Sequence, residues 1–429
     1  MGFIDLGELT GGESEPASAG PPWERWRRRV QVLGLVAVTL LTCGAVETAR
    51  VPPLVEVFSV SSPSHGRSDQ QLLIDGDDLF RVYREGATTW LASYDLTRGG
   101  RRHWQVPVDS SAVGSLVLYG QRLFLQRFPE GQPTDDGALL TPVAMAFDKG
   151  TGASAWSAEG FPFARLGEDK LLFSRGSDLV GVDVATGREL WKRSPGEGGA
   201  ALVGGETPVA PWRMAFAEGT MLRIVDLESG RVLRSRDLGP DQGAVNRFGG
   251  LFATATALVL RQGSSYTTYD PETLEQLWTT SAPESEWAMP CGKLLCQMSG
   301  PEVVAVDVVT GRTRWTSRTD GLYLVGAGVN GAMLGTARGT GIRMVDAATG
   351  EELLNLGRWT PLPGHDGSVD RFALSGIFEG VDWVGFAEVG SRKIRPLAKL
   401  PGAGDEKCVA SDKYLVCTLI TEKLTAWTF

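Results

Sequence analysis

The sequence predicts an all-β protein: a multi-bladed β-propeller of four-stranded antiparallel sheets, preceded by one N-terminal transmembrane helix. Three observations lead to this fold class. An eleven-residue pattern recurs along the chain, an apolar run stands near the N-terminus, and the 429 residues include 55 Gly and 13 Trp. Glycine at this level, without a collagen period and beside many β-branched and aromatic residues, is typical of short strands joined by tight turns.

The N-terminus is predicted to hold a membrane anchor. The first 20 residues are polar, acidic and rich in Gly and Ser, and we expect the tail 1–29 to be disordered and cytoplasmic. An apolar run, Val30–Val46, follows; its 17 residues are the lower end of what spans a bilayer as a helix. Two tryptophans and four arginines precede this run, so the positive-inside rule places everything after Val46 outside the cytoplasm. We predict a signal anchor over 30–46 and a single-pass protein of the cell membrane.

Other interpretations of this segment remain open. A cleaved signal peptide is one, although no small-x-small cleavage site follows the run. A lipoprotein is another, because Leu40-Leu41-Thr42-Cys43 resembles a lipobox, although threonine fits poorly before the cysteine. A buried core helix is the interpretation that requires no export.

An internal repeat organises residues 69–429. In a full copy an apolar strand ends in Asp, a Thr-Gly turn or a variant follows, and Trp stands eight residues after the Asp. The copy at Asp95 has one extra turn residue, so Trp104 falls nine residues later. Ala305–Trp315 is the fullest copy, and Ala146–Trp156 matches it at every key position. Arg234 and Leu354 replace the Trp in two copies, and two weak copies lie around Phe386 and Ala426. The strand-ending aspartates are Asp95, Asp148, Asp183, Asp226, Asp270, Asp307 and Asp346.

The spacing of the copies predicts propeller blades. Intervals run from 35 residues, between Asp148 and Asp183, to 53 residues, between Asp95 and Asp148. The mean is about 42 residues per unit, and a period of roughly 40–45 residues with four short strands is the signature of a propeller blade. A single blade cannot bury both of its faces, so the units are stable only as a ring.

The repeated residues suit structural roles. The Asp carboxylate can accept hydrogen bonds from backbone N–H groups of its own turn, where Gly supplies a positive φ. Tryptophan buries a large surface with one N–H to satisfy, which suits the packing of one blade on the next. We therefore interpret the aspartates as turn caps and predict no catalytic residue among them. The blade-docking residues are predicted to be Trp104, Trp156, Trp191, Trp278 and Trp315.

The pattern Ala-x-Asp-x-x-Thr-Gly-x-x-x-Trp resembles the docking motif of the PQQ-like, or quinoprotein alcohol dehydrogenase-like, β-propeller repeat family. That family includes quinone-dependent alcohol dehydrogenases and BamB-like envelope-assembly lipoproteins. The resemblance implies a ring that usually has eight blades. Eight is therefore the preferred count, with seven and nine as the alternatives, because nine candidate Asp-type strands can be counted.

Ring closure can be predicted from the chain ends. Residues 47–68 form a linker rich in Pro and Ser, within which Leu54–Val60 alternates as a strand does. Phe429 comes just after the last repeat strand, so the last unit lacks an outer strand. Since an open blade exposes a sheet edge, we expect Leu54–Val60 to supply that strand.

Four of the five cysteines form two close pairs. Cys408 and Cys417 flank a hairpin that turns at Ser411-Asp412, and Cys291 and Cys296 flank a tighter one. Cross-strand neighbours lie within disulfide range, so we predict two structural disulfides, with buried free thiols as the alternative. Disulfides persist outside the cytoplasm, which agrees with the predicted export.

Composition and motifs argue against catalysis. Net charge is −9, which gives no basic footprint for nucleic acid, and three histidines leave little material for a metal site. The resemblance also implies PQQ and calcium, held beside an adjacent-cysteine disulfide, but no Cys-Cys dipeptide exists here. We therefore expect no cofactor and no metal. The acidic turns Asp75–Asp78 and Asp135–Gly137 lack the twelve-residue calcium loop and are interpreted as solvated turns.

The predicted function is a non-catalytic extracytoplasmic binding or scaffold propeller, tethered to the membrane through 30–46, that presents loops to a protein, peptide or glycan. The alternatives are a diverged PQQ-dependent oxidoreductase and a BamB-like envelope-assembly lipoprotein. Two stretches interrupt the repeat, Phe128–Leu140 and Leu356–Asp370, and long loops on a rigid scaffold commonly carry recognition. Length drift in a degenerate repeat is the other explanation for them.

Overall fold

The regular structure consists of β-strands and one short 3₁₀ helix, η1 (Leu96–Arg98), among the residues that are described. The computed structural model describes residues 54–61 and most of 71–429. The gaps within the latter range are 110–112, 129–141, 168, 177, 195–198, 204–212, 240–249, 255, 263–264, 282–286, 300–301, 319–322, 328–331, 338–340, 363–370, 389, 401–407 and 420–422. Pro52–Phe429 form one compact unit.

The predicted tail 1–29 and transmembrane helix 30–46 lie outside the described residues. Within the part of the chain that is described, no helix has the length and apolar character needed to cross a bilayer.

The described strands form nine four-stranded antiparallel sheets. Sheet 1 contains β2 (Gln71–Asp75), β3 (Asp78–Glu85), β4 (Thr88–Asp95) and β5 (Arg101–Val108). Sheet 2 contains β6 (Val113–Tyr119), β7 (Arg122–Arg127), β8 (Val143–Asp148) and β9 (Ser154–Glu159). Sheet 3 contains β10 (Phe161–Leu166), β11 (Lys170–Arg175), β12 (Asp178–Asp183) and β13 (Glu189–Arg193). Sheet 4 contains β14 (Ala200–Leu202), β15 (Arg213–Glu218), β16 (Met221–Asp226) and β17 (Val232–Asp237). Sheet 5 contains β18 (Leu251–Ala253), β19 (Leu258–Gln262), β20 (Ser265–Tyr269) and β21 (Gln276–Ser281).

The remaining four sheets follow the same order. Sheet 6 contains β22 (Trp287–Cys291), β23 (Leu294–Ser299), β24 (Glu302–Asp307) and β25 (Thr313–Arg318). Sheet 7 contains β26 (Tyr323–Ala327), β27 (Ala332–Ala337), β28 (Gly341–Asp346) and β29 (Glu352–Gly357). Sheet 8 contains β30 (Thr360–Pro361), β31 (Arg371–Phe378), β32 (Val381–Glu388) and β33 (Lys393–Leu400). Sheet 9 contains β34 (Cys408–Ala410), β35 (Tyr414–Thr418), β36 (Lys423–Thr428) and β1 (Val55–Ser61).

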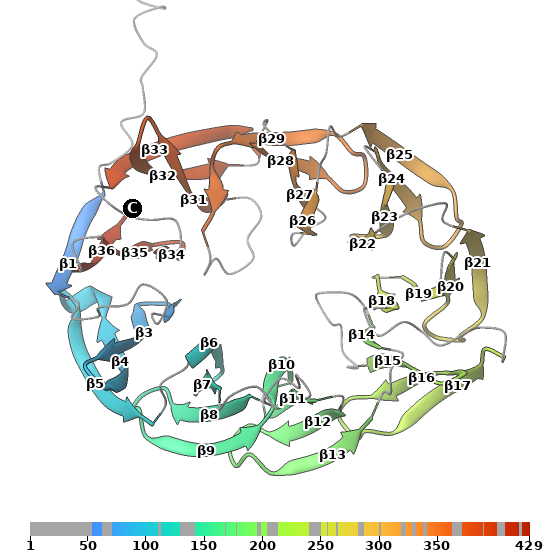
Figure 1. Cartoon of the computed structure of the whole chain (residues 1–429), viewed down its shortest axis with the longest axis horizontal. Helices are drawn as coiled ribbons and strands as arrows, with labels where there is room; N and C mark the ends of the chain where they lie inside the picture. The colour runs from blue at the N-terminus through green and yellow to red at the C-terminus, as the bar shows by residue number, and fades with distance from the viewer. Residues whose placement is uncertain are drawn as a thin grey trace, which may run out of the picture. The chain divides into compact units, whose positions relative to one another are not determined.

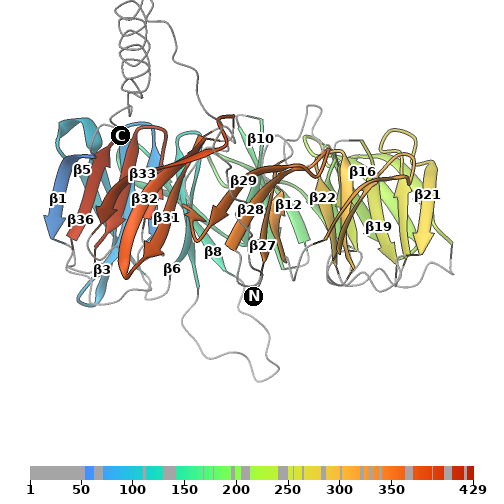
Figure 2. The ribbon, with the colours of Figure 1, turned by 90° about the horizontal axis from the view of Figure 1, so that it is seen from above.

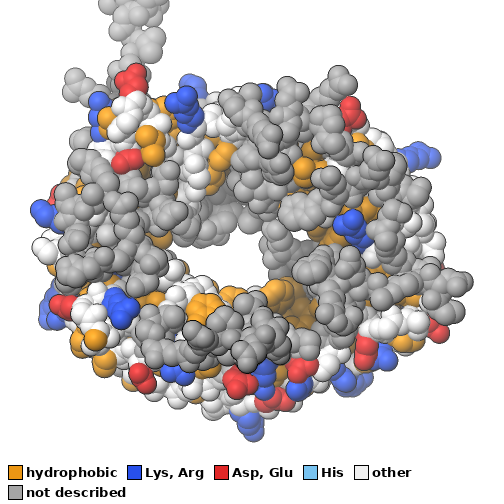
Figure 3. Space-filling model, in the orientation of Figure 1, with side chains coloured by type: hydrophobic (Ala, Val, Ile, Leu, Met, Phe, Trp, Pro, Cys, Tyr) orange, Lys and Arg blue, Asp and Glu red, His pale blue; other side chains and the backbone are white. Residues whose placement is uncertain are grey.

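The nine sheets stand around a central axis, each with its first strand toward the centre and its fourth strand on the rim (Figure 1). Figure 2, turned by 90°, shows that the strands run between the two faces of this ring. Figure 3 shows an opening at the centre, with hydrophobic side chains on the side where β6 and β10 lie. This arrangement is the predicted multi-bladed β-propeller.

The hydrophobic core is divided among the interfaces between neighbouring sheets. In the described residues, nine clusters of buried side chains join sheet 1 to sheet 2, sheet 2 to sheet 3 and so on, and the ninth joins sheet 9 back to sheet 1. Strands in the middle of a sheet are therefore apolar on both faces, as in β12, where Leu179–Val182 are all buried.

The N-terminal strand completes the last sheet. β1 pairs antiparallel with β36, from Val55 opposite Thr428 to Ser61 opposite Lys423. This is the pairing expected for Leu54–Val60. It places the strand in the rim position of sheet 9, although it lies within the stretch 47–68 that was interpreted as a linker.

The number of sheets in the described residues matches one of the alternatives to the preferred count of eight. Nine sheets are seen in the described residues, which equals the number of Asp-type strands counted in the repeat. The two weak copies account for the difference, because their third strands, β32 and β36, form full sheets without the Asp and Thr-Gly turn.

Candidate functional site

The predicted role of the strand-ending aspartates as turn caps is confirmed. In each of six copies, one carboxylate oxygen of the strand-ending Asp accepts the backbone N–H of the residue three positions later, at 2.7–3.0 Å. In the fullest copy, Gly311 N–H also donates to the carbonyl of Asp307, and Gly311 has φ +71°. The carboxylate of Asp95 likewise accepts the backbone N–H groups of Thr97 and Arg98 at the start of η1. This short helix accommodates the one extra residue of that turn.

Hydrogen bonding lowers the pKa of the Asp307 carboxylate. Burial alone would raise the pKa of Asp307, but hydrogen bonds from Arg314 and from the N–H groups of Thr310 and Val309 lower it to about 2. Because the folded-state pKa lies below the ordinary Asp value of about 4, this turn contributes stability above that pH and loses it as the pH falls toward 2.

The five predicted docking tryptophans all contact the next sheet in the same way. Each indole Nε1 donates to the backbone carbonyl of the residue after the Asp, and each ring lies against the glycine of that turn. The donor and acceptor pairs are Trp104 with Lys149 at 3.0 Å, Trp156 with Val184 at 3.0 Å, Trp191 with Leu227 at 2.9 Å, Trp278 with Val308 at 2.7 Å, and Trp315 with Ala347 at 2.9 Å.

Two of the four interfaces without a docking tryptophan use other residues. Phe58 of β1 occupies the docking position of sheet 9, and a Cβ on Gly100 would lie 2.3 Å from its ring. Between sheets 4 and 5, Arg236 rather than Arg234 reaches across and donates to the carbonyl of Leu274 at 2.8 Å. Leu274 stands where the glycine is missing and has φ +59°. Sequence reasoning missed Phe58 because it is not a tryptophan and its strand precedes the first copy of the pattern; its signal was the alternation of Leu54–Val60.

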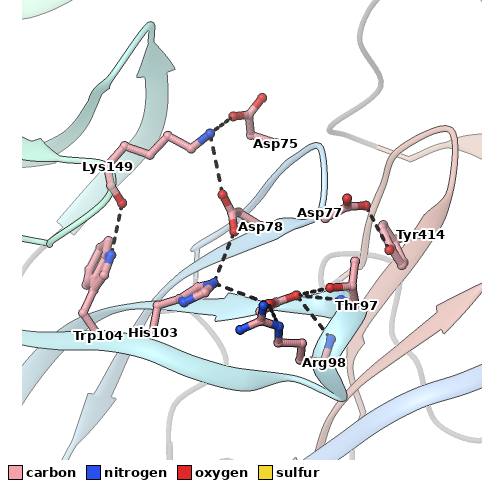
Figure 4. Close-up of polar contacts among 10 residues, drawn as sticks. Asp75, Asp77, Asp78, Thr97, Arg98, His103, Trp104, Lys149 and Tyr414 are labelled. Carbon is pink, nitrogen blue, oxygen red and sulfur yellow. Dashed lines mark hydrogen bonds and ion pairs between the residues drawn. The ribbon is translucent and has the colours of Figure 1, made fainter.

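The acidic turn between β2 and β3 joins three sheets (Figure 4). Asp75 and Asp78 contact the ammonium of Lys149 in sheet 2, and Asp77 accepts the hydroxyl of Tyr414 in sheet 9 at 3.0 Å. Burial and the hydrogen bond to Asp77 raise the pKa of Tyr414 to about 12. His103 lies 3.6 Å from Asp78 and 3.8 Å from Asp95. These carboxylates therefore cross-link neighbouring sheets instead of standing free in solvent.

The described residues do not fit the PQQ and calcium that the family resemblance implies. Across the described part of the chain, no group of three or more His, Cys, Asp or Glu side chains is placed to hold a metal ion. The four described cysteines are bonded within two separate hairpins, so none forms a disulfide between adjacent residues. We therefore derive no reaction step through a quinone.

Both predicted disulfides are present. Cys408 and Cys417 lie directly opposite each other on β34 and β35, with Cα atoms 4.1 Å apart. Cys291 and Cys296 are diagonal instead, with Cα atoms 5.8 Å apart, since Cys291 pairs with Leu294 across a two-residue turn. Each disulfide joins the innermost strand of its sheet to the next strand. The fifth cysteine, Cys43, lies outside the described residues.

Alkylation of the unreduced protein is expected to add at most one label, at Cys43, because the other four thiols are oxidised. Intact mass measured with and without prior reduction checks this, and the reduced, denatured protein should take five labels. Four further labels without reduction would contradict both disulfides.

A groove lies on sheet 8, where the repeat departs most from its pattern. Its volume is about 410 Å³, and its lining consists of Trp359, Phe378, Glu379, Val381, Trp383, Pro396 and Lys399. The strand register explains this set. Phe378 pairs with Val381, Gly376 with Trp383, Trp383 with Lys399, and Gly385 with Pro396. Directly paired residues point to the same side of a sheet, so these side chains share one face.

Two glycines on that face leave room for the indole of Trp359, which forms an aromatic wall of the groove. A Cβ on either Gly376 or Gly385 would lie 3.2 Å from the indole of Trp359, which therefore packs flat on β31 and β32. The centroids of the Trp359 and Phe378 rings lie 4.9 Å apart, and Trp359 is only 8% exposed. Trp359 is thus packed against β31, β32 and Phe378, beside the groove.

Charge is confined to two positions of the groove. The ammonium of Lys399 lies 5.1 Å from the ring centre of Trp383. Within the described residues, two other basic side chains of β33 and the turn before it form ion pairs, Arg392 with Glu351 and Arg395 with Glu388, and Lys399 takes part in neither. Glu379 stands in the β31–β32 turn with φ +53°. The remaining lining is apolar, which is typical of binding sites with a few polar groups that orient a ligand.

The two stretches proposed for recognition have different outcomes. Phe128 is 40% exposed, but 129–140 lie outside the described residues. The second stretch, Leu356–Asp370, contributes Trp359 to the groove, and its residues 363–370 are not described. Trp383, Pro396 and Lys399 were not singled out from the sequence, because only the strand register brings them beside Trp359.

Fold and contacts together define a disulfide-bonded β-propeller with docked repeats and a groove on one sheet. A family model described as "Outer membrane protein assembly factor BamB" matches residues 175–321 and 217–358, which together are less than half of the chain. This match supports the PQQ-like repeat in that region. No curated protein matches the sequence.

Three solved structures illustrate the likeness. BamB from Moraxella catarrhalis is 15% identical, with a TM-score of 0.41, covering 88% of this chain and 100% of that one. A eukaryotic initiation factor is 12% identical, with a TM-score of 0.48 and coverage of 79% and 91%. A europium-containing methanol dehydrogenase is 12% identical, with a TM-score of 0.40 and coverage of 85% and 84%.

Proposed function

We propose that this protein is an exported, membrane-tethered propeller that binds a partner protein and catalyses no reaction. The groove on sheet 8 is the observation that carries the binding role, since it combines aromatic side chains with an apolar lining and a lysine whose ammonium lies over the Trp383 ring. The two disulfides support an oxidising compartment. The apolar run 30–46, preceded by arginines, is the proposed tether.

A protein partner suits the groove better than a glycan. Glycan sites combine an aromatic platform with many hydrogen-bonding groups for hydroxyls, whereas this lining offers two charged side chains, Glu379 and Lys399. An envelope-assembly role is one form of such a function, in line with the family whose model matches 175–358. Fold alone does not fix that role.

Crosslinking in intact cells tests the proposal. The full-length protein is expected to capture a partner from outside the cytoplasm and to stay in the membrane fraction, whereas a variant that lacks residues 1–46 should not be retained there. Recovery of the full-length protein in the soluble cytoplasmic fraction would contradict the tether. Dye-linked dehydrogenase activity after incubation with PQQ and calcium would contradict the non-catalytic assignment.

A further inference from the structure

We propose that the groove on sheet 8 recognises a peptide segment of its partner in which a large apolar side chain lies next to a carboxylate. This inference rests on the proposed binding function and gives it a chemistry. The apolar side chain would lie between Trp359 and Trp383, and the carboxylate would pair with the ammonium of Lys399.

The size of the groove limits what it can hold. A volume of about 410 Å³ is near the lower end of the roughly 300–1,000 Å³ of small-ligand sites. It therefore accommodates one large side chain and part of its neighbour. Trp359 comes from the chain before β30, and Phe378 and Trp383 come from the end of β31 and the start of β32, so two segments supply aromatic surface. A phenylalanine or leucine side chain is the occupant that such walls bury best.

The position of Lys399 decides the charge of the ligand. Aromatic walls beside a glutamate would by themselves suit a cation, but the ammonium of Lys399 already lies over the face of Trp383. A second cation there would be repelled, and a carboxylate would be attracted. Lys399 is on the rim strand β33 and Glu379 is in the β31–β32 turn, so the carboxylate lies toward the rim.

Fluorescence polarisation with labelled peptides tests the proposal. The probe is a capped nonapeptide of glycine and serine with one glutamate directly before one phenylalanine. The comparison peptide has the same sequence with glutamine in place of glutamate. Because Lys399 is exposed, we expect the glutamine peptide to bind the full-length protein two- to fivefold more weakly. Trp383→Ala should weaken binding of the glutamate peptide at least tenfold.

Charge reversal gives the sharper measurement. Lys399→Glu should prefer a peptide with lysine in place of glutamate, whereas Lys393→Glu, a matched lysine on the same strand outside the groove lining, should keep the original preference. Equal binding of the glutamate and glutamine peptides, an unchanged preference in Lys399→Glu, or no peptide binding at millimolar concentration overturns the proposal. If these variants still capture the cellular partner, the binding function stands and only its assignment to the groove fails.

Discussion

Replacing Phe58 by alanine is expected to lower the free energy of unfolding by about 3–5 kcal/mol, as for other buried aromatic side chains. Phe58 is 8% exposed, its ring stacks on Tyr94 at 6.2 Å, and the ring lies directly on Gly100. It is the side chain through which β1 fastens sheet 9 to sheet 1. Chemical denaturation of the wild-type protein and Phe58→Ala measures the difference.

The control lies two residues further along the same strand. Val60 is 39% exposed, so Val60→Ala should change stability by no more than about 0.5 kcal/mol. Loss of β1 from β36 would also leave a sheet edge unpaired, and Phe58→Ala is therefore expected to self-associate on size-exclusion chromatography before it unfolds. If both variants are equally stable, β1 does not close the ring in the way that its register indicates.

The repeat made most of the fold predictable because its contacts are local or repeated. Asp307 and Thr310 are three residues apart and form their hydrogen bond within one turn, so the pattern is visible in the sequence. Trp315 contacts Ala347 in the next copy, which again stands at a known offset in the repeat. A contact that recurs with the same spacing can be read from residue order, even when it joins two sheets.

The features that sequence reasoning missed depend on where the repeat fails. Phe58 docks on the turn after Asp95, and its spacing from that turn is like that of the tryptophans, but it is not a tryptophan and its strand precedes the first copy of the pattern. The groove needs Trp359 to lie on Gly376 and Gly385, and such a contact follows from register rather than from motif. The Cys291–Cys296 bond was predicted correctly, but its diagonal geometry was not, since the length of the turn decides which residue faces Cys291.

A paired test of Trp156 and Gly187 examines the docking contact itself. Trp156→Ala is expected to lower the free energy of unfolding by about 3 kcal/mol, the lower end for a buried aromatic because the side chain is partly exposed. Gly187→Ala should also be destabilising, by about 2–4 kcal/mol. Gly187 has φ +73°, which costs an L-residue roughly 1–2 kcal/mol, and its Cβ would lie 2.5 Å from the Trp156 indole.

The two losses should not add, because the steric part of Gly187→Ala disappears once the indole is gone. In the Trp156→Ala background, Gly187→Ala should cost only the backbone part, roughly 1–2 kcal/mol. Gly176, in the same sheet, has φ +60° and nothing within 4 Å of a built Cβ, so Gly176→Ala should cost that same amount in either background. A double-mutant cycle by urea denaturation measures all of these values. Full additivity of Trp156→Ala and Gly187→Ala would mean that the indole does not rest on the turn, and that the recurring tryptophan and glycine are independent features of the repeat.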